Sequence, residues 1–152
     1  MSMHQDDLFY LARKAEALRL RAGLLSGIRR FFSDHDFLEV ETPVRIPSPA
    51  PEEHIEGIES GNWFLQTSPE LCMKRLLAAG YPKIFQICKC FRADERGDRH
   101  LPEFTLLEWY VAGFDYHRLI RCPSPNRCLM SVGLSRPAFS LRGVYPGPFW
   151  FR

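Results

Sequence analysis

The chain has 152 residues, of which 45% are hydrophobic and 25% charged, and its formal net charge is +2 at pH 7. This length accommodates one domain with a hydrophobic core and is too short for two ordinary domains. Residues 1–120 carry 15 basic and 18 acidic side chains, a net charge of −3, and the rest adds five arginines and no acid, which argues against a nucleic-acid-binding module.

The first predicted element is a helix. Apolar residues recur at steps of three and four from about Asp6 to His35, which is the period of an amphipathic helix. They are Leu8, Leu11, Ala15, Leu18, Ala22, Leu25, Ile28 and Phe32. Gly23 and Gly27 interrupt this pattern and favour either two helices or one long helix with a weak point.

Two short strands and a loop are predicted next. The first strand covers Phe37 to Glu41 and ends at Thr42-Pro43, because proline cannot donate a hydrogen bond to a ladder. A proline-rich loop follows over residues 46–53. The second strand covers Trp63 to Gln66 and leads into a new helix.

The second predicted helix covers Pro69 to Ala79. Ser68 is a good N-cap residue, Pro69 suits the first helical position, and Gly80 can end the helix. Glu70 then lies in the first turn, where the helix dipole favours a carboxylate by roughly 0.3–1 kcal/mol. Glu70 therefore has two interpretations, a purely structural residue or a ligand for a cationic group.

A polar hairpin follows and is the most informative part of the chain. A strand ending at Arg92 and a strand returning from Glu103 place Gln86, Arg92, Glu108 and Tyr110 on one face, because side chains alternate along a strand. Burying unpaired charge is costly, so this face is a candidate site. The alternative is that Arg92 and Glu108 pair across an ordinary hairpin, which stabilises it by roughly 0.2–1 kcal/mol.

The remaining signals concern the cellular compartment. No segment approaches the ~20 apolar residues of a transmembrane helix, so we expect no membrane span. The five cysteines contain no pair of CxxC units, and Cys88 and Cys90 point to the same face of a strand. An odd cysteine count without a signal peptide is typical of a reducing cytoplasm.

Three blocks resemble class II lysyl-tRNA synthetases in order and spacing. They are FLEVETP at 37–43, TSPELCMKRL at 67–76 and FRADERGDRHLPEFTLLEWY at 91–110, which resemble the motif 1 and motif 2 regions. Within that group, the chain is most similar to the short paralogue that attaches lysine to a translation elongation factor. The resemblance covers roughly Leu18 to Leu119 and implies an α+β fold, a partial class II domain with an antiparallel sheet and flanking helices.

The resemblance also implies roles for individual residues. The motif 2 arginine that grips the α-phosphate of ATP corresponds to Arg92, with Asp94 and His100 as further ATP contacts. The substrate contacts are Ser68, Glu70, Glu108 and Tyr110, and the dimer-interface proline is Pro43. Two departures are visible, because the family has a glutamate where Asp94 stands and an asparagine where Leu101 stands.

The implied activity is ATP-dependent activation of lysine and its transfer to a protein lysine on a translation elongation factor. The cofactors would be ATP and Mg²⁺, with metal ligands expected in a downstream part, and the protein would be a homodimer. Only about 20 residues precede Leu18, too few for an anticodon-binding barrel, which favours a protein acceptor over tRNA. The alternatives are a lysine-tRNA ligase fragment or a noncatalytic remnant that dimerises or binds lysine weakly.

We expect a domain boundary near residue 120. Residues 1–120 correspond to motifs 1 and 2, whereas residues 121–152 contain five prolines, five arginines and no acid. This Pro/Arg-rich tail is interpreted either as a truncated or frameshifted reading, with poor order, or as a divergent genuine segment. Because no motif 3 follows, we expect little lysine-dependent pyrophosphate–ATP exchange, a measurement that separates an enzyme from a remnant.

Overall fold

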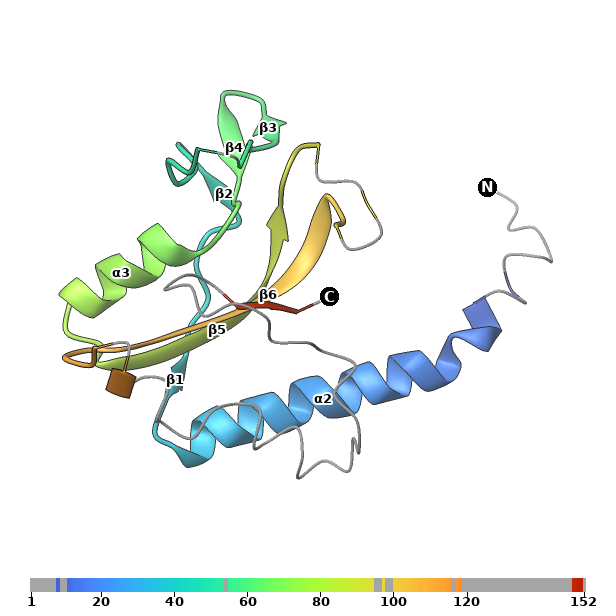
Figure 1. Cartoon of the computed structure of the whole chain (residues 1–152), viewed down its shortest axis with the longest axis horizontal. Coiled ribbons are helices and arrows are strands. Elements are labelled where there is room, and N and C mark those ends of the chain that lie inside the picture. The colour runs from blue at the N-terminus through green and yellow to red at the C-terminus, as the bar shows by residue number, and fades with distance from the viewer. Residues whose placement is uncertain are drawn as a thin grey trace.

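A computed structural model describes Leu8 and residues 11–53, 55–94, 97, 100–115, 117–118 and 149–151. A four-stranded sheet of order β1-β5-β6-β7 forms the centre, and a three-stranded sheet of order β2-β4-β3 lies beyond one end of it. Helices α2 and α3 lie on opposite sides of the central sheet (Figure 1). The α+β class expected from the sequence is therefore observed.

The centre of the sheet is the predicted hairpin. Strands β5 (Lys83–Phe91) and β6 (Glu103–Val111) pair antiparallel over nine residues each. Strand β7 (Phe149–Phe151) pairs antiparallel with β6, and it is the described part of the Pro/Arg-rich tail. The other residues of the tail lie outside the described part of the chain, so the domain boundary near residue 120 stays a prediction.

The edge strand β1 (Leu38–Glu39) differs from expectation in two ways. It is shorter than the predicted strand 37–41, and it pairs parallel with β5, so the sheet is mixed and not purely antiparallel. A parallel pair needs a long crossover connection. Here the connection is long because β2, β3, β4 and α3 all lie between β1 and β5 in the chain.

Helix α2 (Ala15–Asp34) is continuous through both glycines. The interruption in the predicted helix lies instead at Lys14, which forms a turn after a short helical stretch. A glycine costs a helix roughly 1 kcal/mol relative to alanine, which packing of the apolar face can outweigh. The expected weak point at Gly23 or Gly27 is therefore not a break.

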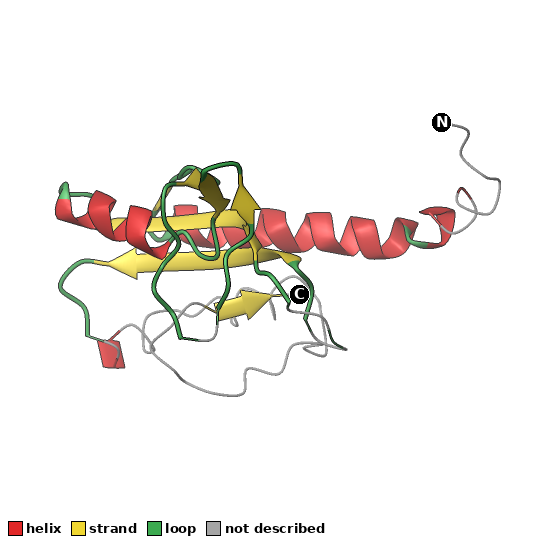
Figure 2. Ribbon diagram, turned by 90° about the horizontal axis from the view of Figure 1, so that it is seen from above, coloured by secondary structure: helices red, strands yellow, loops and turns green. Residues whose placement is uncertain are grey.

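The main core lies between α2 and one face of the hairpin. Phe32 is 1% exposed and stacks on Phe85 with ring centroids 4.5 Å apart, and Ile28 and Leu107 complete the buried cluster. Only the C-terminal half of α2 is covered in this way. Its N-terminal half extends beyond the sheet (Figure 2), and Leu18 there is 60% exposed.

The small sheet contains one predicted strand and two that were not predicted. Strand β4 (Trp63–Leu65) was expected, whereas β2 (Arg45–Ile46) and β3 (Glu59–Ser60) pair with it. Strand β2 runs into the predicted proline-rich loop, and no prediction was made for residues 59–60. The Arg45 side chain donates to the Ser60 carbonyl at 2.8 Å. Two-residue strands depend on such tertiary partners and carry little local signal.

Helix α3 (Glu70–Ala78) is one residue shorter than predicted at each end, and its N-cap position is Pro69 and not Ser68. Ser68 Oγ accepts a hydrogen bond of 3.1 Å from the backbone N–H of Glu70, and Gly80 ends the helix with φ of +99°, a conformation that favours glycine. The serine hydroxyl thus fixes where α3 starts beside the sheet.

Replacing Phe32 with alanine tests the core. Because Phe32 is buried against Phe85, Phe32→Ala should lower the free energy of unfolding by about 3 to 5 kcal/mol in urea titrations. The control is Leu71→Ala at an exposed position of α3, which should change it by less than about 0.5 kcal/mol. Equal effects of the two substitutions would contradict this assignment of the core.

Candidate functional site

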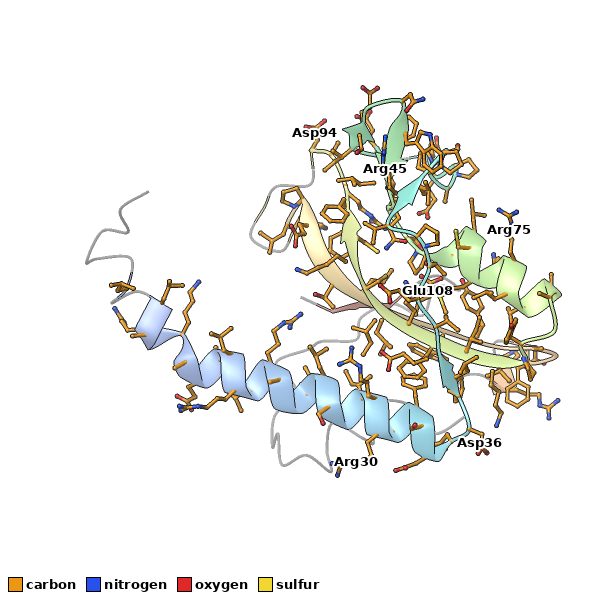
Figure 3. The ribbon with its side chains drawn as sticks, turned by 180° about the vertical axis from the view of Figure 1, so that it is seen from behind. Arg30, Asp36, Arg45, Arg75, Asp94 and Glu108 are labelled. Carbon is orange, nitrogen blue, oxygen red and sulfur yellow. The ribbon has the colours of Figure 1, made fainter. Side chains whose placement is uncertain are left out.

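The second face of the hairpin is polar and lies on the side of α3. Ser68, at the start of α3, bonds to Glu108 on this face. Gln86 pairs directly with Glu108 in the ladder, so their side chains project to the same side. Figure 3 shows Glu108 between the hairpin and α3. The predicted alternation of faces is therefore confirmed for Gln86, Glu108 and Tyr110.

Glu108 is held from two elements. It is 4% exposed, and its Oε2 accepts a hydrogen bond of 3.0 Å from Ser68 Oγ while its Oε1 accepts one of 2.5 Å from Tyr110 OH. A buried carboxylate requires donors of this kind. Three predicted substrate residues thus form one hydrogen-bonded group, in which Ser68 and Glu108 are 40 positions apart in the sequence.

Burial dominates the electrostatics of this group. It raises the pKa of Glu108 above its ordinary value, and the hydrogen bonds from Tyr110 and Ser68 lower the pKa without cancelling that effect. The negative charge of Glu70 raises the pKa further, and the positive charge of Lys74 lowers it. Burial and the neighbouring carboxylate also raise the pKa of Tyr110. A cation placed beside Glu108 would relieve this unfavourable environment.

Arg92 lies on the same face beyond the end of β5. It is 6% exposed, and its guanidinium lies 5.5 Å from the centre of the Phe104 ring. The backbone N–H of Arg92 donates to the carbonyl of Pro102, whereas Glu108 lies opposite Gln86. Six ladder positions, roughly 20 Å of extended strand, therefore separate Arg92 from the position opposite Glu108. Arg92 and Glu108 therefore do not form the cross-strand pair of an ordinary hairpin.

Cys90 lies between these two charges on the same face. Its pKa is raised first by the hydrogen bond with Cys88 and by burial, then by the charge of Glu108, and is lowered by the charge of Arg92. The sulfur atoms of Cys88 and Cys90 are 3.8 Å apart, as their predicted shared face requires. Arg92 and Glu108 thus act on one buried thiol, although they are far apart along the ladder.

Glu70 occupies the edge of this group. Its side chain forms an ion pair with Lys74 one helical turn later, and it is only partly buried. Both interpretations of Glu70 therefore remain compatible with its position, since it lies in the first turn of α3 and also influences Glu108.

The other predicted residues lie farther out. Asp94 is exposed in a turn with φ of +56°, and Figure 3 shows it at the outer end of the hairpin, away from Glu108. His100 is exposed and pairs with Gly97 through the backbone. Pro43 is exposed between β1 and β2. The structure does not bring these three to Glu108, and their expected roles stay predictions.

Several buried polar residues were given no role by the sequence pattern. Within the described part of the chain, hydrogen-bond partners are lacking for Gln66 Oε1, Thr67 Oγ1 and both amide atoms of Gln86. Gln66 and Thr67 directly precede Ser68, so a run of three polar residues before the helix was the available signal. The strand pattern placed Gln86 on the polar face without assigning it a function.

Among the residues that the structure describes, no group of three or more His, Cys, Asp or Glu side chains is arranged to hold a metal ion. In the same residues, no helix is long and apolar enough to cross a membrane. The expected Mg²⁺ stays a prediction.

Comparison with known proteins identifies the family. The sequence model of the class II tRNA synthetases (D, K and N) matches residues 7–124. The chain belongs to this family. The match covers the first helix, the polar hairpin and α3 together.

Several relatives are elongation factor P–(R)-β-lysine ligases. The protein from Actinobacillus succinogenes is 43% identical over 128 residues, covering 78% of this chain and 40% of the relative. Those from Histophilus somni and Klebsiella pneumoniae are 48% and 46% identical over 113 and 131 residues, covering 68% and 80% of this chain. The matched segments make up 35% and 40% of the lengths of these two relatives. The chain thus spans about two fifths of these relatives.

The raised pKa of Glu108 predicts a pH-dependent difference in stability. Between the unfolded-state pKa of about 4.5 and the higher folded-state pKa, Glu108 binds more protons in the folded protein than in the unfolded chain. The free energy of unfolding therefore falls as the pH rises through this range. Glu108→Gln has no carboxyl group to titrate and so does not show this fall. Its free energy of unfolding relative to the original protein should therefore increase with pH above 4.5 and then level off. Urea titrations at a series of pH values measure this difference, and a difference independent of pH would contradict it.

Proposed function

We propose that this chain supplies the lysine site and a phosphate contact of a ligase that activates the carboxylate of lysine or (R)-β-lysine with ATP, for transfer of the lysyl group to a lysine side chain of elongation factor P. Two kinds of observation support this proposal. The relatives carry that ligase name, and the polar face of the hairpin contains an anionic and a cationic group on one surface. The observation that carries it is the buried Glu108 held by Ser68 and Tyr110.

Glu108 would bind an ammonium group of the substrate. Its carboxylate is buried and its pKa is raised by burial, so an ammonium group would replace the water that the charge has lost. Ser68 and Tyr110 each donate to a different oxygen of Glu108 and so hold the carboxylate plane in place. Lysine and its β isomer carry two ammonium groups, and Glu70 at the edge of this group suits the other.

Arg92 would bind the α-phosphate of ATP. In adenylate formation a substrate carboxylate oxygen attacks the α-phosphorus, a new oxygen–phosphorus bond forms, and the bond to the leaving pyrophosphate breaks. The two anions repel each other, and a fixed guanidinium with forked donors offsets that repulsion. Arg92 and Glu108 lie at different positions along one face of the hairpin, as the two differently charged ends of one ligand would need. Mg²⁺ would supply further positive charge at the phosphates, and no residue is assigned to it.

A second copy of this chain would cover the N-terminal half of α2. Leu18 and Phe32 are separated by a multiple of seven residues and so lie on one stripe of α2. Phe32 is buried in the core, whereas Leu18 on the same stripe is exposed. Pro43 and its neighbour Val44 are exposed as well. We propose this stripe together with Pro43 as the homodimer interface implied by motif 1.

Binding of a nonhydrolysable lysyl-adenylate analogue tests the proposed site. We expect the analogue to bind, and Glu108→Gln to weaken both the analogue and lysine by about tenfold or more, because a charged hydrogen bond is lost. Arg92→Lys keeps the positive charge and loses the forked pair of guanidinium donors, so it should weaken binding of the analogue more than binding of lysine. Calorimetric titration measures each dissociation constant.

The controls for this test are a glutamyl-adenylate analogue and the β isomer of lysine. The glutamyl analogue carries a carboxylate where lysine carries an ammonium, so it should bind far more weakly. Equal binding of the two analogues, or no binding of the lysyl analogue, would refute the proposed function. Comparison of lysine with (R)-β-lysine identifies the preferred isomer.

The proposed dimer has its own test. Leu18→Glu places a charge on the exposed stripe of α2 and should shift the protein from dimer to monomer in light scattering after size-exclusion chromatography. Leu71→Glu makes the same change at an exposed position of α3 and should leave the dimer intact. A monomeric starting protein would refute the dimer without affecting the lysine site.

A further inference from the structure

Gln86 is an unusual residue for a well-packed sheet. It is 1% exposed, and neither its Nε2 nor its Oε1 has a hydrogen-bond partner among the residues that the structure describes. Most buried side-chain polar atoms in proteins have a partner, because leaving one without a partner destabilises the fold. An apolar side chain of the same size would suit this position better for stability alone.

The position of Gln86 suggests why an amide is present. It lies directly opposite Glu108 in the antiparallel ladder, where side chains on one face stand roughly 5 Å apart at Cβ. Glu108 is the group to which the proposed function assigns a substrate ammonium. A cation held by Glu108 would therefore lie within reach of the Gln86 amide oxygen.

The hydrogen-bonding capacity of the site supports the same pairing. An ammonium group has three donors, and a carboxylate has about four lone-pair sites. Ser68 and Tyr110 already occupy one site on each oxygen of Glu108. The two remaining sites leave one donor of the ammonium without an acceptor, and Gln86 Oε1 is a buried acceptor on the same face without a partner.

We propose that Gln86 is a further substrate-binding residue, whose amide oxygen accepts a hydrogen bond from the ammonium group held by Glu108. This inference rests on the proposed lysine site. A neutral acceptor suits the position, because a second buried carboxylate beside Glu108 would repel it when no substrate is bound. The amide therefore completes the coordination of the cation without adding charge to the empty site.

Gln66 provides a matched control with a structural role. It is also fully buried, and its Nε2 donates a hydrogen bond of 2.8 Å to the carbonyl of Lys89. Its backbone N–H and C=O bond to neighbouring segments as well. Replacing the Gln66 side chain thus breaks a hydrogen bond within the fold, whereas replacing the Gln86 side chain breaks none among the described residues.

The test compares Gln86→Met with Gln66→Met in lysine titrations and urea unfolding. We expect Gln86→Met to weaken lysine binding about tenfold, the equivalent of about 1.4 kcal/mol, with stability unchanged or increased. Gln66→Met should lower the stability. If Gln86 had only a structural role, Gln86→Met would lower the stability and leave the lysine affinity within twofold of the original. This outcome would overturn the inference.

Two further ligands test whether the contact is with the ammonium at Glu108. Norleucine lacks the side-chain ammonium of lysine, and 6-aminohexanoate lacks the α-ammonium. One of these two ligands lacks the ammonium that Glu108 binds. For that ligand, neither Glu108→Gln nor Gln86→Met should change the affinity. If Glu108→Gln weakens lysine and Gln86→Met does not, the inference fails and the proposed function stands. If the original protein binds no lysine, both fail.

Discussion

The buried carboxylate of Glu108 is the constraint on which the polar half of this molecule depends. It is nearly inaccessible to water, so its charge must be compensated by donors from the protein or by a cation. Ser68 and Tyr110 supply two neutral donors, and the pKa stays raised because burial outweighs them. The site without ligand is therefore electrostatically incomplete, which is the state expected of a group that binds an ammonium.

The same hairpin supports the core and the site, because its two faces are separated by the alternation of side chains. Phe85 and Leu107 project toward α2 and form the apolar core, while Gln86 and Glu108 project toward α3. A shift of one residue in either strand would exchange these faces and bury charge in the core. Packing of Phe32 against Phe85 thus also holds the polar face in register.

Much of this arrangement could be predicted from local sequence. Alternation along β5 and β6 identified the polar face, and the Ser68 and Gly80 signals identified the ends of α3 to within one residue. Errors arose where a partner distant in sequence decides the outcome. The parallel pairing of β1 and the short strands β2 and β3 depend on such partners.

The sequence by itself determined which residues share a face, where α3 is capped, and the family resemblance that the comparison with known proteins confirmed. These properties follow from periods of two and 3.6 residues and from capping chemistry, which act over a few neighbouring positions. Only the tertiary structure decided that Gln86 stands opposite Glu108, that Arg92 stands opposite Pro102, and that the Ser68 hydroxyl reaches the carboxylate. Register and burial depend on contacts between distant segments, and these also decide which polar groups obtain a partner.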